Sequence, residues 1–204
     1  MEKEKVVLPK FNVETYLKDG DAVIDKLKDV EAAADKIHDK GYENIFLLGM
    51  GGTYDELEPI QYIMNKYSEV EVHLSNAAEL NVLGNKRLNK KSIVITASAS
   101  GDTKEIVEAV EWIVKEGIDV MAFTKPETPL GKLATMIVTA PVTTGQCEYS
   151  YLMFDVLALR LLNRRGEFPK YDDFVAQTKI FSTILLVFVK NSMKEQMRLQ
   201  NSMH

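Results

Sequence analysis

The sequence predicts an α/β protein, a three-layer α-β-α sandwich built around a five-stranded parallel sheet. Two observations predict this fold class. Short runs of consecutive apolar, often β-branched residues alternate along the chain with longer segments whose apolar residues recur at helical spacing. The connections between these segments are short, which favours right-handed crossovers that place helices on both faces of one sheet.

The elements follow one another in regular alternation. Strands are predicted at residues 44–48, 70–73, 93–95, 120–124 and 136–139. Helices are predicted at residues 21–40, 54–67, 77–83, 103–116, 129–135 and 149–164, with another starting at Tyr171. We therefore assign residues 21–175 to one domain, residues 1–20 to an N-terminal extension and residues 176–204 to a C-terminal helical tail. The tail is either a helix that pairs with another subunit or the truncated start of a second half.

Composition excludes several classes of protein. The formal net charge of −5 argues against nucleic acid or an anionic membrane as partner. Cys147 is the single cysteine, so the chain forms no internal disulfide and suits the reducing cytoplasm. The apolar run at 180–189 is about half the length that spans a bilayer. Its uncovered face (Ile180, Phe181, Ile184, Leu185 and Phe188) instead predicts a homodimer.

Two loops of small residues each follow a predicted strand and lead into a predicted helix. The first is residues 49–53, and the second is residues 98–103. Because the carboxyl ends of parallel strands meet at one edge of a sheet, we expect both loops there. The first N–H groups of a helix and its dipole attract anions, so the loops predict a phosphate site. Ser98, Ser100 and Thr103 would add hydroxyl donors to this site, and Gly101 would permit close approach of the backbone to the ligand.

A structural interpretation of the second loop also stands, in which Ser100, Asp102 or Thr103 is the N-cap of the following helix. The loop is not a nucleotide P-loop, because no Gly-Lys-Ser/Thr follows, and the dinucleotide Gly-x-Gly-x-x-Gly spacing is missing. No metal-ligand spacing of His, Cys or carboxylates occurs, so we expect neither a metal nor another cofactor.

Taken in order, these motifs resemble the SIS (sugar isomerase) domain of phosphosugar isomerases and phosphosugar-binding proteins. Residues 49–54 are similar to the family's Gly-x-Gly-Ser/Thr-Ser-Tyr loop, and residues 98–103 match its Ser-x-Ser-Gly-x-Thr. Further similarities lie at residues 78–80, 122–125, 129–130 and 146–148. The resemblance covers roughly residues 20–175. Its nearest branch is the N-terminal SIS domain of the fructosamine-6-phosphate and 6-phosphofructose–amino acid deglycases.

The resemblance implies an SIS-type, flavodoxin-like fold, with a phosphorylated sugar as the ligand of the two loops. It implies that Thr53 binds the phosphate together with Ser98, Ser100 and Thr103, and that Gly51 and Gly52 allow close approach. It also implies that Glu148 contacts the ligand, although Glu148 also fits a helix-start residue that favours the dipole. The deglycases carry their acid–base glutamate and histidine in a second SIS domain, near a Glu-x-x-His-Gly-Pro-like stretch. This chain has no such stretch, so its catalytic residues are unknown.

Three functions are consistent with the sequence. The chain is the phosphosugar-binding half of a deglycase or aldose/ketose isomerase, a regulatory sugar-phosphate-binding module without turnover, or a single-domain sugar-phosphate isomerase. Histidines do not decide among them. We interpret His38 as a solvated helix residue, His73 as a structural residue at a strand end near the ligand, and His204 as part of the terminus. Whether this chain alone is an enzyme is therefore open.

Overall fold

The computed structural model describes residues 12–139, 147–181, 183–185, 187 and 191. Its centre is a five-stranded parallel sheet in the order β2-β1-β3-β4-β5. The strands are β1 (Asn44–Gly49), β2 (Glu71–Asn76), β3 (Ser92–Ala97), β4 (Asp119–Phe123) and β5 (Met136–Val138). This topology confirms the predicted α/β sandwich. Chain order reverses between β1 and β3, which makes their carboxyl ends the switch point of the sheet.

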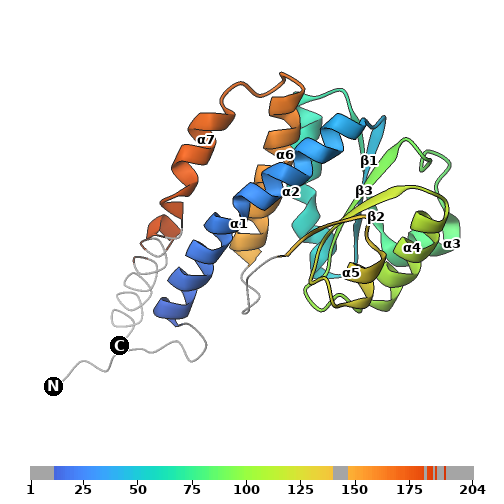
Figure 1. Ribbon diagram of the computed structural model, residues 1–204, viewed down its shortest axis with the longest axis horizontal. Helices are drawn as coiled ribbons and strands as arrows, with labels where there is room; N and C mark the ends of the chain where they lie inside the picture. Colours follow the sequence, from blue (N-terminus) through green and yellow to red (C-terminus); the bar gives the residue numbers. More distant parts are fainter. Residues whose placement is uncertain (1–11, 140–146, 182, 186, 188–190, 192–204) are drawn as a thin grey trace, which may run out of the picture.

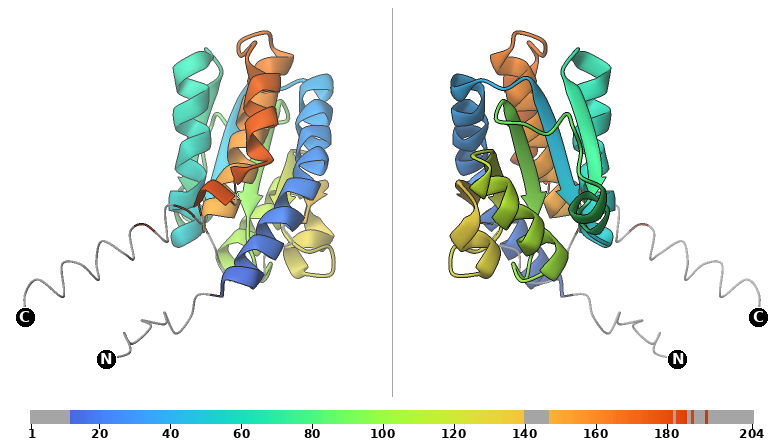
Figure 2. Two further views of the ribbon diagram at one scale, coloured as in Figure 1. Left: turned by 90° about the vertical axis from the view of Figure 1, so that its left-hand side faces the viewer. Right: turned by 90° about the vertical axis from the view of Figure 1, so that its right-hand side faces the viewer.

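Helices cover both faces of the sheet (Figure 1). They are α1 (Val13–Lys40), α2 (Gly52–Tyr67), α3 (Ala77–Leu83), α4 (Lys104–Lys115), α5 (Pro129–Leu133), α6 (Cys147–Arg164) and α7 (Tyr171–Thr178). Helices α1, α2 and α6 pack on one face, and α3, α4 and α5 pack on the other. In the left view of Figure 2, α7 lies over α6 and between α1 and α2.

The three central strands, β1, β3 and β4, are buried on both faces, which explains their largely continuous apolar runs. Ile45 and Leu47 contribute to the core beneath α1, α2 and α6, whereas Phe46 and Leu48 contribute to the core beneath α3, α4 and α5. This alternation is the two-residue period of a β-strand.

Helix α1 starts at Val13, so the predicted start at Asp21 is wrong. The Asn12 side chain caps the helix by accepting a hydrogen bond of 2.9 Å from the Thr15 backbone N–H. Asp19 and Gly20, which precede the predicted start, are poor helix formers. Both residues are buried within the helix, so tertiary packing outweighs their local propensity.

Polar contacts join α1 to α6 and α7. Asp35 accepts two hydrogen bonds from the Arg160 guanidinium, at 2.7 and 2.9 Å, and these bonds hold the pKa of the Asp35 carboxyl below its usual value. The Tyr171 hydroxyl donates a hydrogen bond of 2.8 Å to Glu31. These contacts fix the outer helices on the face of the sheet that carries α6.

The structure also revises the position of His73. Strand β2 continues to Asn76, because its last residues pair with β1, so the expectation that His73 ends a strand is wrong. Its ring packs on Phe46 with centroids 4.7 Å apart, and its Nε2 lies 3.3 Å from a Glu71 carboxylate oxygen. These contacts support the structural interpretation of His73.

In the described part of the C-terminal tail, some apolar side chains pack against the core and others are exposed. Phe181 and Leu185 pack against the core, whereas Ile180 and Ile184 stay 54% and 43% exposed. Phe188 and His204 lie outside the described residues, as do residues 1–11 of the predicted extension. Among the helices of the described ranges, none combines the length and apolar character needed to cross a membrane. The domain boundaries at residues 20 and 175 stay predictions.

Candidate functional site

The two predicted loops leave neighbouring strands at the same edge of the sheet. In the parallel β1–β3 pair, Leu48 lies opposite Thr96, and the Thr96 hydroxyl donates a hydrogen bond of 2.7 Å to the Leu48 carbonyl. Met50 and Gly51 then connect β1 to α2, and residues 98–103 connect β3 to α4. The loops therefore flank the switch point, where parallel α/β proteins bind their ligands.

The β1–α2 loop is open. Gly51 is the N-cap of α2, and Gly52 and Thr53 are its first two residues. Gly51 and Gly52 are exposed and Thr53 is half-buried. Within the described part of the chain, no side chain caps this helix, so its first N–H groups face outward. The helix lies close to the strand, since a Cβ added at Gly49 would sit 2.5 Å from the Tyr54 Cα.

The β3–α4 loop is held by its own hydrogen bonds. Buried Ser98 accepts a bond of 3.0 Å from the Gly101 N–H, and its hydroxyl lies 3.3 Å from that of Thr103. Thr103 is the N-cap of α4, so the suggestion that Asp102 caps it is wrong; the Thr103 hydroxyl turns to Ser98 and makes no cap bond. Ser100 is exposed. Ser98 thus shapes the loop, while Ser100 and the N–H groups of α4 face outward.

Gly101 serves packing more than ligand approach. It is buried with φ of +69°, and an added Cβ would lie 2.2 Å from the Thr128 hydroxyl oxygen and 2.7 Å from that of Thr124. Thr124 donates a hydrogen bond of 2.9 Å to the Ser98 carbonyl, and the two threonine hydroxyls are 3.2 Å apart. Thr124 lies in one of the stretches that resemble the family, but no sequence pattern indicates a role for either threonine. The hydroxyls of Thr124 and Thr128 lie beneath the β3–α4 loop and support it.

Glu148 lies on the first turn of α6, beside the first turns of α1. It is half-buried and follows directly before Tyr149, whose hydroxyl donates a hydrogen bond of 2.6 Å to the backbone carbonyl of Tyr16. The Glu56 carboxylate of α2 is the main cause that raises the pKa of the neighbouring Cys147 thiol. Helix α6 packs against both α1 and α2. Tyr16 and Glu56 were missed, because nothing local in the sequence pairs them with α6.

Asp155 is a further acidic residue of α6 that the sequence did not single out. Burial raises the pKa of its carboxyl to about 6. Of the predicted neighbours of Glu148, Gln146 lies outside the described residues. In the ranges that the structure describes, no group of three or more His, Cys, Asp and Glu side chains is arranged to hold a metal ion.

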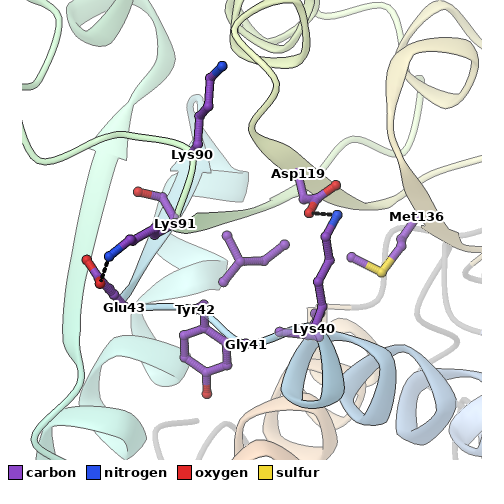
Figure 3. A pocket seen from close by; sticks show the side chains of 11 residues that line it. Lys40, Gly41, Tyr42, Glu43, Lys90, Lys91, Asp119 and Met136 are labelled. Carbon is purple, nitrogen blue, oxygen red and sulfur yellow. Dashed lines mark hydrogen bonds and ion pairs between the residues drawn. The ribbon is translucent and has the colours of Figure 1, made fainter.

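A cavity of about 350 Å³ lies at the opposite, amino-terminal edge of the sheet (Figure 3). Ion pairs between Lys40 and Asp119 and between Lys91 and Glu43 stand at its wall, and Lys90 also lines it. The C-terminal end of α1 meets this cavity and presents carbonyl groups, which disfavour an anion. The carboxyl edge, where α2 and α4 begin, is therefore the better anion site.

A parallel sheet with two such loops at its switch point defines a class of α/β proteins that bind small ligands at the carboxyl edge. Residues 36–161 match the model of the SIS domain. This chain belongs to the SIS domain family, as its motifs predicted.

Comparisons with known proteins place the chain beside enzymes and binding proteins of phosphosugars. Fructosamine deglycase FrlB of Bacillus subtilis (strain 168) is 30% identical over 112 residues, which are 54% of this chain and 34% of FrlB. A candidate phosphosugar isomerase from Salmonella typhimurium LT2 matches with a TM-score of 0.73 at 24% identity, over 85% of this chain and 54% of that chain. The Vibrio vulnificus NanR protein complexed with ManNAc-6P matches with a TM-score of 0.59 at 22% identity, over 82% and 68%. The chain thus spans about a third of FrlB and about half of the Salmonella protein.

Proposed function

We propose that this chain binds a phosphorylated sugar or amino sugar at the carboxyl ends of β1 and β3. One observation carries the proposal: α2 and α4 begin on either side of the switch point, and neither described N-terminus is capped by a side chain. Such N–H groups need acceptors, and a phosphate offers three oxygens and a double negative charge. The hydroxyls of Thr53 and Ser100 add donors from each loop.

The sugar would extend from the phosphate toward α6. We assign Glu148 as the carboxylate of this site, because α6, on whose first turn it lies, packs against α2. A carboxylate can orient sugar hydroxyls or accept a proton near C1 and C2. The phosphate would lie between Gly51 and Gly52 of the β1–α2 loop and Ser98, Gly101 and Thr103 of the β3–α4 loop.

We further propose that the chain is the phosphosugar-binding half of a deglycase or aldose/ketose isomerase, active as a homodimer in the cytoplasm. The relation to FrlB supports the deglycase class, and the exposed Ile180 and Ile184 support the dimer. A regulatory module without turnover and a single-domain isomerase are the alternatives. The NanR protein is similar in fold and holds ManNAc-6P, so it supports sugar-phosphate binding but does not distinguish an enzyme from a binding module. Incubation of purified protein with fructose-6-phosphate, glucosamine-6-phosphate and fructosamine-6-phosphate separates these roles, because only an enzyme consumes a substrate.

Calorimetric titration tests the binding proposal. We expect fructose-6-phosphate to bind at least tenfold more tightly than fructose, because the free sugar lacks the charge that the helix N-termini attract. Thr53→Val and Ser100→Ala each remove one hydroxyl bond to a charged group and should weaken binding of the phosphate by about tenfold. Thr183→Val, at an exposed position of the tail, is the matched control and should change nothing. Equal affinity for sugar and sugar phosphate would refute the site.

A further inference from the structure

The cavity at the amino-terminal edge of the sheet combines buried apolar side chains with charged ones (Figure 3). Ile37 and Ile93, which are 2% and 4% exposed, line it together with Tyr42 and Met136. The charged side chains that line it are Lys40, Glu43, Lys90, Lys91 and Asp119. Its volume of about 350 Å³ falls in the range of small-molecule pockets, roughly 300–1,000 Å³. It is separate from the phosphosugar loops, which lie at the opposite edge of the sheet.

Two ion pairs stand on different sides of this cavity in the view of Figure 3. Lys91 pairs with Glu43 at 2.5 Å, and Lys40 pairs with Asp119. The side chain of Asp119 is 24% exposed, whereas those of Lys40, Glu43 and Lys91 are 64%, 60% and 68% exposed. Because water and salt screen a partly buried charge less than an exposed one, Asp119 attracts an opposite charge most strongly of the four.

The charges around the cavity disfavour a ligand of a single sign. The negative end of the α1 dipole and the carboxylates of Glu43 and Asp119 oppose an anion. The three lysines, Lys40, Lys90 and Lys91, oppose a cation. A ligand that carries one charge of each sign can place each beside an opposite charge of the protein. The cavity therefore favours a small zwitterion.

We propose that this cavity binds a zwitterionic α-amino acid with an apolar side chain. The ammonium group lies between Asp119 and the C-terminal end of α1, and the carboxylate lies at Lys91. The apolar side chain packs on Ile37 and Ile93, where it leaves water for an apolar surface. The site goes beyond the proposed function and requires no phosphosugar to be bound.

Calorimetric titration of the purified protein with leucine tests the site. Isocaproate is leucine without its ammonium group, and isoamylamine is leucine without its carboxylate. Because each analogue lacks one bond between charged groups, each should bind at least tenfold more weakly than leucine. If leucine does not bind, or if all three compounds bind equally, the proposal is wrong. Displacement of leucine by fructose-6-phosphate would place it at the carboxyl edge and would also overturn the proposal.

Variants assign the two charged ends of the ligand. Asp119→Asn keeps the shape of the side chain and should weaken leucine at least tenfold without weakening isocaproate, which has no ammonium group. Lys91→Met changes an exposed side chain, so folding is not at risk; it should weaken leucine similarly and leave isoamylamine unchanged.

The matched control is Lys26→Met. Lys26 also lies on the surface of α1 and pairs with a carboxylate, that of Asp29, at 2.7 Å. Its replacement removes the same charge away from the cavity and should leave leucine affinity unchanged. If Asp119→Asn and Lys91→Met behave like this control, the amino-acid site is refuted, whatever the result at the phosphosugar loops.

Discussion

The two loops of the candidate site are built in opposite ways. In the β1–α2 loop, Gly51 and Gly52 are exposed, and a Cβ added at either would meet nothing within 4 Å. In the β3–α4 loop, Gly101 is buried against the Thr128 hydroxyl, and Ser98 accepts a hydrogen bond from its N–H. One loop offers free backbone, while the other is ordered by side chains before any ligand arrives.

This difference separates residues that shape a loop from residues that are free to bind a ligand. The sequence motif alone does not distinguish these two roles. Residues of the β3–α4 loop that look like ligands, such as Ser98, hold the shape of the turn. The groups free for a ligand are the exposed Ser100 and the N–H groups of two helices. A loop ordered in advance loses less entropy when it binds, so its internal bonds contribute to affinity indirectly.

The largest expected effect is on stability and comes from Gly101→Ala. The positive φ and the overlap with Thr128 should together destabilise the protein by about 2–4 kcal/mol. Gly52→Ala, which meets open space, should stay within about 0.5 kcal/mol of wild type. Guanidinium unfolding of both variants measures the contrast. Similar midpoints for the two would show that the loops do not differ as described.

Two serines in one loop should then show opposite effects. Ser98→Ala leaves the buried Gly101 N–H without its acceptor and should cost about 1–3 kcal/mol of stability. Ser100→Ala should leave stability within about 0.5 kcal/mol and act on phosphate affinity alone. Unfolding and calorimetry on the same preparations test this. A stability loss at Ser100 equal to that at Ser98 would contradict the division of roles.

The smallest effect is expected from the layer beneath the loop. Thr124 is 3% exposed, and Thr124→Val keeps its shape while removing its hydrogen bond to the Ser98 carbonyl. We expect the free energy of unfolding to fall by about 1 kcal/mol. Phosphosugar affinity should change less than with Ser100→Ala, because Thr124 affects the loop through its bond to the Ser98 carbonyl and not through the proposed ligand groups. A larger loss of affinity than of stability would instead make Thr124 a ligand contact.

Local pattern was sufficient for the sheet and both loops. The strands are continuous apolar runs because both faces of a parallel sheet are covered, and small residues mark their carboxyl ends. The pattern failed at Val13–Gly20, where packing against α6 overrides the weak propensity of Asp19 and Gly20. The hydrogen bonds of Tyr149 to Tyr16 and of Thr124 to Ser98 join distant parts of the chain, so no periodicity could predict them.

Helix α1 has 28 residues and is therefore about 42 Å long, enough to cross the whole domain. Tyr16 near one end lies against the first turn of α6, where the Tyr149 hydroxyl donates a hydrogen bond to its backbone carbonyl. Lys40 at the other end pairs with Asp119 at the far cavity (Figure 3). One continuous helix therefore carries tertiary contacts at both edges of the sheet.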